Sequence, residues 1–172
     1  MKKILLFTIL ISGFLVSNAR AQWDDSGKLN AWTSNVVSRR NKESKKTPYL
    51  KEVRVAKNKG FDRIVFEFLG DIPRYRIEYI KPPITNTADQ EIKVSGNFFV
   101  SITLQLLPYP DDEKFPEAEI PEGKLNFPVI SELREIEWFE GDRPFAVGLK
   151  AKKLYRVQQL KNPARLVIDF KQ

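Results

Sequence analysis

The side chains that most often perform acid–base, nucleophilic or metal chemistry are missing from this chain. Its 172 residues include neither cysteine nor histidine. Thiol chemistry and a lipid-modified cysteine are therefore ruled out, and the commonest general base and metal ligand is lacking. The remaining routes to catalysis are paired carboxylates, a Ser/Lys pair or a metal held by carboxylates.

One acidic cluster, Asp111, Asp112 and Glu113, could bind calcium weakly. It lacks the spaced ligands and the glycine of a dedicated calcium loop, and the chain has no glycine-rich phosphate loop and no catalytic serine elbow. We therefore expect a protein that is not an enzyme and has neither a cofactor nor a metal site. A carboxylate-based hydrolase is the remote alternative.

Aromatic rings close in sequence to arginines indicate a second kind of chemistry. Sugar sites combine exposed aromatic faces with polar groups, because rings stack on the sugar while charges and amides orient its hydroxyls. Tyr75 and Tyr79 share a strand face with Ile77, and Trp138 shares one with Ile136, so all three aromatic residues are expected in the core. The remaining candidates for ligand binding in this class are Tyr109, which stands between two prolines, Tyr155, Phe115 and Arg143. The other arginines close in sequence to the aromatic candidates are Arg74, Arg76 and Arg156.

A six-residue pattern occurs twice, as "RIVFEF" from Arg63 to Phe68 and as "RLVIDF" from Arg165 to Phe170. Strand alternation turns three large apolar side chains of each copy to one face and an arginine, a valine and an acid to the other. The outward charges could contact a ligand or could form cross-strand ion pairs. Exposed charges on strands are commonplace, which favours the ion pairs over the ligand contacts. The pattern is therefore stronger evidence for two central strands than for a ligand-binding site. The candidate ligand contacts on these strands are Arg63, Glu67, Arg165 and Asp169.

The elements that would position these residues are short strands. From Pro48 onward, segments rich in Val, Ile, Phe and Tyr alternate with period two and are separated by turn signals such as "NKG" and "EGDRP". This texture predicts an all-β domain over residues 48–172, a sandwich or a closed barrel. Five prolines between Pro108 and Pro128 predict a long ordered loop. Its Phe115, Ile120 and Phe127 are expected to pack onto the domain.

Residues 1–21 are typical of a secretory signal peptide. Lys2 and Lys3 precede an apolar run from Ile4 to Val16, and Ala19-Arg20-Ala21 supplies small residues at the cleavage site. The run is shorter than the roughly 20 residues of a membrane-spanning helix. Cleavage would lower the formal charge from +7 to +4, because three cations and no acid are removed. We expect an exported protein, periplasmic or extracellular, without a stable membrane anchor.

The polar segment 22–47 is predicted to be a poorly ordered basic arm. Its run "RRNKESKK" could dock on an anionic surface or could be a solvated linker, and charge patterning favours the linker. Trp23 and Trp32 are unusual in such an arm. They either pack back on the domain or mark a short amphipathic helix around Leu29 to Val37.

Two segments resemble the AMIN-like domain of exported envelope proteins. "NPARLVIDF" is similar to an AMIN signature in which Pro, one residue and Arg lead an aliphatic strand that ends in Asp and a large apolar residue. "VRVAKNKGFDRIVFEFLGDIPRYRIEYI" resembles the opening of the AMIN-like domain, with a Gly-aromatic-Asp-Arg turn before a strand and a Pro-x-Tyr-Arg segment after it. The resemblance covers about residues 50–172. It implies a β-sandwich of two facing sheets and a cell-envelope role, and AMIN domains are thought to bind peptidoglycan.

This sequence departs from the family's pattern in two ways. It has no cysteine for lipidation, and it carries no amidase or secretin domain that could be targeted. The first functional expectation is a non-catalytic envelope module that binds peptidoglycan or another cell-wall glycan. The alternative is an adaptor that binds an envelope or export protein through the proline-rich loop or a strand edge. Export makes nucleic acid an unsuitable partner despite the basic balance, and the sequence predicts no oligomeric state.

Overall fold

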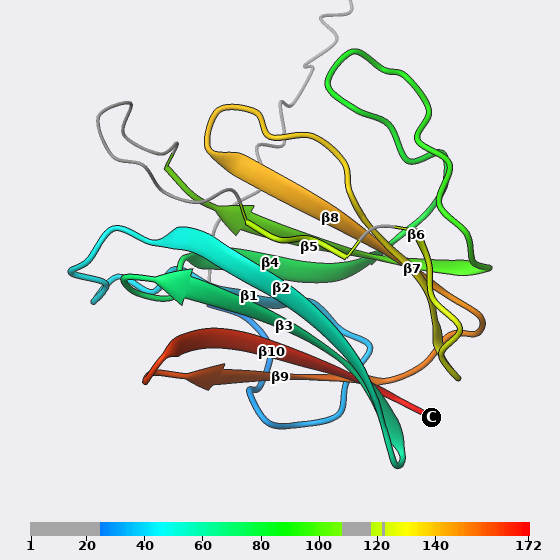
Figure 1. Cartoon of the computed structure of the whole chain (residues 1–172), viewed down its shortest axis with the longest axis horizontal. Coiled ribbons are helices and arrows are strands. Elements are labelled where there is room, and N and C mark those ends of the chain that lie inside the picture. Colours follow the sequence, from blue (N-terminus) through cyan, green and yellow to red (C-terminus); the bar gives the residue numbers. More distant parts are fainter. Residues whose placement is uncertain (1–24, 108–117, 122) are drawn as a thin grey trace, which may run out of the picture.

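A computed structural model describes residues 25–107, 118–121 and 123–172, and in this part of the chain every regular element is a β-strand (Figure 1). No helix there has the length and hydrophobicity to cross a bilayer. The strands are β1 Val37–Arg39, β2 Tyr49–Asn58, β3 Phe61–Leu69, β4 Arg74–Ile80, β5 Phe98–Gln105, β6 Gly123–Lys124, β7 Ile130–Glu135, β8 Asp142–Leu149, β9 Tyr155–Leu160 and β10 Ala164–Lys171.

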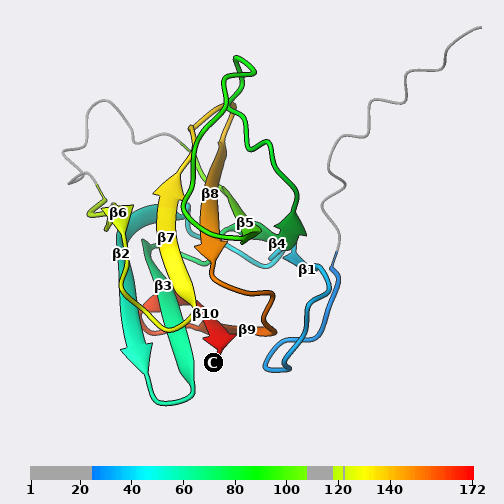
Figure 2. The same cartoon turned by 90° about the vertical axis from the view of Figure 1, so that its right-hand side faces the viewer.

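The strands form two antiparallel sheets that face each other. The six-stranded sheet has the order β1-β4-β5-β8-β7-β6, and the four-stranded sheet has the order β2-β3-β10-β9. Figures 1 and 2 show the two layers, with β5 and β8 in one and β3 and β10 in the other. The prediction of an all-β sandwich of two facing sheets is confirmed.

The two copies of the repeated pattern are β3 and β10, which lie side by side at the centre of the four-stranded sheet. Their inward side chains form much of the core: Ile64, Phe66, Phe68, Leu166, Ile168 and Phe170 are all at most 3% exposed. Phe66 packs edge-on against Phe145 of the opposite sheet, with ring centroids 5.1 Å apart. Burial of three such side chains stabilises the fold by about 5–9 kcal/mol per strand before chain entropy is subtracted.

The structure differs from the prediction of a poorly ordered arm. Residues 30–33 run along the edge of the four-stranded sheet, where Thr33 pairs with Tyr155 and the Asn30 amide donates to the Val157 carbonyl. The chain then crosses to the other sheet, where β1 pairs with β4 and Val37 is completely buried. Figure 2 shows this blue segment beside the chain that enters β9. Sequence composition could not reveal this, because the partners of the arm are more than thirty residues away in the chain.

The described ends of the proline-rich loop pack onto the sandwich. Ile120 and Phe127 are partly buried against the core, as the sequence predicts. The Val53 amide of β2 donates to the Glu119 carbonyl at 2.9 Å, so this segment pairs with the outer edge of β2. Residues 108–117 and 122 lie outside the described residues, and with them the predictions for Tyr109, Phe115 and the acidic cluster. Residues 1–21, for which a signal peptide is predicted, and Trp23 lie outside them too.

Candidate functional site

The outer face of the four-stranded sheet carries most of the polar side chains that the sequence analysis selects. Antiparallel pairing places Arg63 of β3 opposite Asp169 of β10, and Asp169 opposite Arg156 of β9. The three residues therefore form one row across the sheet, with the acid in the middle. Directly opposed side chains on one face are within contact distance.

Asp169 is completely buried and accepts hydrogen bonds from both sides of this row. The Arg63 guanidinium binds it in bidentate fashion, with Nε 2.6 Å from Oδ1 and Nη2 3.0 Å from Oδ2. From the other side, Nη2 of Arg156 lies 2.6 Å and Nε2 of Gln158 lies 3.0 Å from Oδ2. A buried carboxylate is tolerated only with such partners, and Asp169 in turn fixes the planes of two arginines. The hydrogen bond to Asp169 raises the pKa of Arg63 above its ordinary value, so this guanidinium stays charged.

Aromatic rings lie against both arginines. The guanidinium carbon of Arg63 lies 4.9 Å from the centroid of Phe61, and that of Arg156 lies 4.7 Å from Trp32 and 5.9 Å from Phe61. Such contacts are cation–π interactions. Trp32 belongs to the segment that runs along β9, so the structure supports packing of this tryptophan on the domain and places no helix at residues 29–37. We call the surface formed by Trp32, Phe61, Arg63, Arg156 and Asp169 the arginine–aromatic face.

The arginine–aromatic face retains hydrogen-bonding capacity. Arg63 and Arg156 bind Asp169 through Nε and Nη2, and their Nη1 groups have no hydrogen-bond partner among the described residues. The side chains of Arg63 and Arg156 are 32% and 27% exposed. Two arginines and one aspartate leave a net charge of +1. The surface therefore offers half-buried aromatic rings, fixed N–H donors and a positive charge, which suits a sugar or polymer that carries acidic groups.

The other predicted residues on this sheet form a second row that behaves differently. Glu67 is nearly buried, and its carboxylate accepts from Lys51 Nζ at 2.8 Å and from Arg54 Nη2 at 3.0 Å, both on β2. The Lys51 hydrogen bond, helped by Arg54, holds the pKa of Glu67 below its ordinary value. Arg165 lies opposite Glu67 in the ladder, yet it forms no ion pair with the residues that the structure describes.

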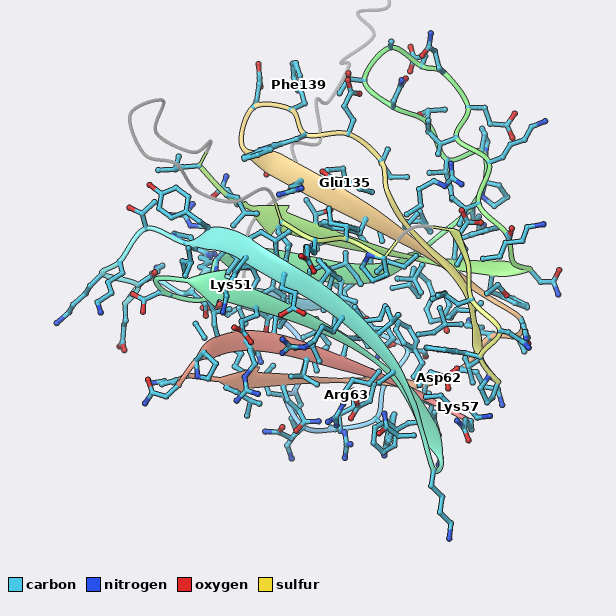
Figure 3. All side chains as sticks on the ribbon, in the orientation of Figure 1. Lys51, Lys57, Asp62, Arg63, Glu135 and Phe139 are labelled. Atoms are coloured by element: carbon cyan, nitrogen blue, oxygen red, sulfur yellow. The ribbon has the colours of Figure 1, made fainter. Side chains whose placement is uncertain are left out.

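Arg143 lies elsewhere. It belongs to β8 in the six-stranded sheet, where it lies on the same inward face as Phe145, two residues further on, and is 8% exposed. Its guanidinium forms a bidentate pair with Glu135, at 2.7 and 3.0 Å, and contacts the ring of Trp138 at 5.0 Å. Figure 3 shows Glu135 and Phe139 on the upper layer and Lys51 and Arg63 on the lower one. Of the candidates within the described residues, the structure thus brings together Arg63 and Asp169 and keeps Arg143 apart. Glu67 and Arg165 lie on the same face as Arg63 and Asp169, beyond the intervening pair of Val65 and Val167.

Sequence reasoning did not place Trp32, Phe61, Arg156 or Gln158 on this surface, although it selected Arg156 as an arginine close to candidate aromatic residues. A usable signal exists for the last two. "YRVQQL" and "ARLVIDF" are separated by a short "KNP" turn, and a hairpin with that turn places Arg156 opposite Asp169. No comparable signal exists for Trp32, which reaches the sheet from an irregular segment.

The side chains of the Gly-aromatic-Asp-Arg motif, Gly60 to Arg63, point to both faces of the sheet. Gly60 adopts a φ of +87°, which suits the tight turn between β2 and β3. Phe61 and Arg63 point to the arginine–aromatic face, whereas Asp62 is completely buried on the other side. Oδ2 of Asp62 accepts from the Val129 and Ile130 amides at 2.6 and 3.0 Å, which ties β3 to the start of β7 (Figure 3). This motif and "NPARLVIDF" meet at the Arg63–Asp169 pair.

Both the fold and this surface define an all-β module with a polar, aromatic-bearing sheet face. The model of the AMIN-like domain family matches residues 48–172, so the chain belongs to the AMIN-like domain family. This family is related to the cell envelope, and its members are in general non-catalytic binding domains typical of exported proteins. No curated protein matches the chain. No solved structure matches it either.

Proposed function

We propose that this protein is an exported, non-catalytic envelope module that binds peptidoglycan or another cell-wall polymer through the arginine–aromatic face. The observation that carries the proposal is the row in which buried Asp169 holds Arg63 and Arg156 against the rings of Phe61 and Trp32. An outer sheet face suits a long glycan better than a small molecule, because small-molecule sites are usually concave. The envelope role of the family supports the same class of ligand.

Two features make this surface suitable for a charged glycan. Ring faces stack on the apolar faces of sugars, and the Nη1 donors of Arg63 and Arg156 can bind carboxylate or hydroxyl oxygens. Both arginines are already oriented by Asp169, so little side-chain entropy is lost on binding. Lys171 adds a further positive charge, since its Nζ lies 6.0 Å from the Trp32 ring.

The edges of the four-stranded sheet favour this proposal over the adaptor. An adaptor that binds a partner strand needs free backbone groups at a sheet edge. The β2 edge is paired at Val53 with Glu119, and the β9 edge is paired at Tyr155 and Val157 with residues 30–33. These contacts occupy backbone groups that strand addition would use.

Co-sedimentation with purified insoluble sacculi tests the proposal. We expect the wild-type protein to pellet with the sacculi well above a basic control protein of equal net charge. Trp32→Ala and Arg156→Gln should each lower the affinity by about fivefold or more, which corresponds to about 1 kcal/mol. Enrichment no greater than that of the control protein, or full retention of binding in both variants, would overturn the proposal.

A further inference from the structure

One end of the sandwich holds a hollow of about 450 Å³ that is separate from the arginine–aromatic face. It lies where β4 and β8 begin and β5 ends, and the turn after β1 closes it. These strand ends are at the left of Figure 1. We call this cavity the end hollow; its polar lining consists mainly of Arg40, Lys42, Arg74, Gln105 and Glu140.

The charge of the end hollow is unbalanced. Among the described residues of the lining, Arg40, Lys42 and Arg74 contribute three positive charges and Glu140 contributes one carboxylate. None of the three cations forms an ion pair or a side-chain hydrogen bond with any residue that the structure describes. Asp142, which stands opposite Gln105 in the β5–β8 ladder, does not line the hollow.

Arg40 carries an unsatisfied donor. Its Nε is buried and has no hydrogen-bond partner within the described residues. A buried N–H without a partner is destabilising, and native proteins rarely retain one unless water or a ligand satisfies it. An oxyanion in the end hollow would compensate the three positive charges, and a rotation of the Arg40 side chain would bring its buried Nε to that acceptor.

A neighbouring hollow on the other side of the same turn differs from the end hollow in the charge balance of its lining. Its lining includes three cations, Arg39, Lys42 and Lys161, and three acids, Asp25, Glu43 and Asp71. Arg39 is satisfied by the carbonyls of Ser26, Ser38 and Gly27. Charge balance and the satisfied donors of Arg39 leave an anion less to bind in the neighbouring hollow than in the end hollow.

The turn that bears Arg40 and Lys42 is fixed before any ligand arrives. The Arg40 amide donates to Asp25 Oδ1 at 2.9 Å, and the Asn41 side chain donates to the Pro73 carbonyl at 2.6 Å. Asp71 then accepts from the Lys45 and Lys46 amides at 2.7 and 2.8 Å. A preformed site loses less entropy on binding than a mobile one does.

We propose that the end hollow binds an oxyanion, a carboxylate or phosphate group of a ligand, through Arg40, Lys42 and Arg74. Arginine and lysine side chains are the usual protein ligands for both groups. Gln105 adds an amide donor to the same lining. Glu140 opposes binding by charge repulsion and therefore tunes the affinity. The site does not depend on the proposal that the arginine–aromatic face binds a wall polymer.

Nuclear magnetic resonance titration of the purified protein tests this site. Sodium phosphate and sodium acetate are added in separate arms, with ionic strength held constant by sodium chloride. We expect a saturable shift of the Arg40 and Arg74 Nε–H signals and of the amides around them in at least one arm. The arm that saturates at the lower concentration identifies the preferred oxyanion. Shifts that fail to saturate in both arms, or that spread evenly over the basic surface, would overturn the proposal.

Matched variants sharpen the test. Arg40→Gln and Arg74→Gln together should weaken binding by about tenfold or more, whereas Lys161→Gln, which removes a charge from the neighbouring hollow, should change it by less than about twofold. Glu140→Gln should strengthen binding by about two- to fivefold, because it removes the repulsion. If the double arginine variant fails to fold, the exposed positions Lys42 and Glu140 provide the test instead. Lys42→Gln should weaken oxyanion binding, and Glu140→Gln should strengthen it. Equal affinity in all folded variants would contradict the site.

Discussion

Across the β3–β10 ladder, Arg63 faces Asp169, and further along the same two strands Glu67 faces Arg165. Both rows place an arginine opposite an acid, but only the first forms the cross-strand pair. Asp169 is short and has an arginine on each neighbouring strand, so it stays in its row and becomes fully buried. Glu67 is longer and reaches diagonally to Lys51 and Arg54 on β2, which leaves Arg165 unpaired among the described residues.

The difference shows that strand register determines which charged side chains lie opposite each other. Whether an opposed pair forms an ion pair then depends on the charged residues of the other neighbouring strand, β9 for Asp169 and β2 for Glu67. The first row stabilises the sheet and orients two arginines against aromatic rings. The second row stabilises the β2–β3 contact and leaves one arginine to solvent. Four kinds of variant can break or sharpen this comparison.

Asp169→Asn should cause the largest loss of stability. It keeps the shape of the side chain but leaves Arg63 and Arg156 without their buried counter-charge, so we expect the free energy of unfolding to fall by about 2–4 kcal/mol. Urea denaturation followed by tryptophan fluorescence measures this. A loss below about 0.5 kcal/mol would mean that the Asp169 row does not stabilise the sheet.

A pair of double-mutant cycles should separate the two rows. The cycle of Arg63→Gln with Asp169→Asn is expected to give a coupling energy of about 1–3 kcal/mol. The cycle of Arg165→Gln with Glu67→Gln should give a coupling within about 0.3 kcal/mol of zero, because these residues do not pair. Equal coupling in the two rows would contradict the geometry described above.

Glu67→Gln should have a smaller effect that depends on pH. Because Lys51 and Arg54 lower the pKa of Glu67 in the folded protein, its contribution is complete above its ordinary pKa and is lost as the pH falls through the lowered value. We expect the variant to be less stable by about 1 kcal/mol at neutral pH and to match the wild type in strong acid. Denaturation curves at several pH values check this, and a difference that persists unchanged in acid would refute it.

Arg165→Gln should change the free energy of unfolding least, by less than about 0.5 kcal/mol, since the residue has no ion pair to lose. Thermal denaturation beside Arg63→Gln, which removes the same charge from the same face, provides the control. A loss in Arg165→Gln that equals the loss in Arg63→Gln would show that the two arginines are equivalent.

Much of the fold follows from local sequence, because strand alternation needs only neighbouring residues. The inward triplets of β3 and β10 were predictable for this reason, as was the burial of Tyr75 beside Ile77. Sequence alone left open whether β3 and β10 share a sheet, since pairing joins residues about a hundred positions apart. The prediction of a poorly ordered arm at residues 22–47 differs from the structure for the same reason. Its polar composition is local, whereas its pairing with β4 and β9 is not.

The candidate site was only half predictable. Arg63 and Asp169 are selected by the repeated pattern, but the choice between an ion pair and a ligand contact depends on Arg156, Phe61 and Trp32. These come from a neighbouring hairpin strand, a turn and an irregular segment. The structure also shows that an ion pair need not preclude ligand binding, because Nη1 of each arginine has no hydrogen-bond partner among the described residues.

The binding of sacculi by Arg63→Gln and Arg165→Gln, measured side by side, tests the central claim most directly. The two variants lose the same charge from the same sheet, so nonspecific attraction to an anionic polymer falls equally in both. We expect Arg63→Gln to bind about fivefold more weakly than Arg165→Gln, and Arg165→Gln to bind nearly as tightly as the wild type. Equal binding by the two variants, whether weakened or not, would contradict a site built on the Asp169 row.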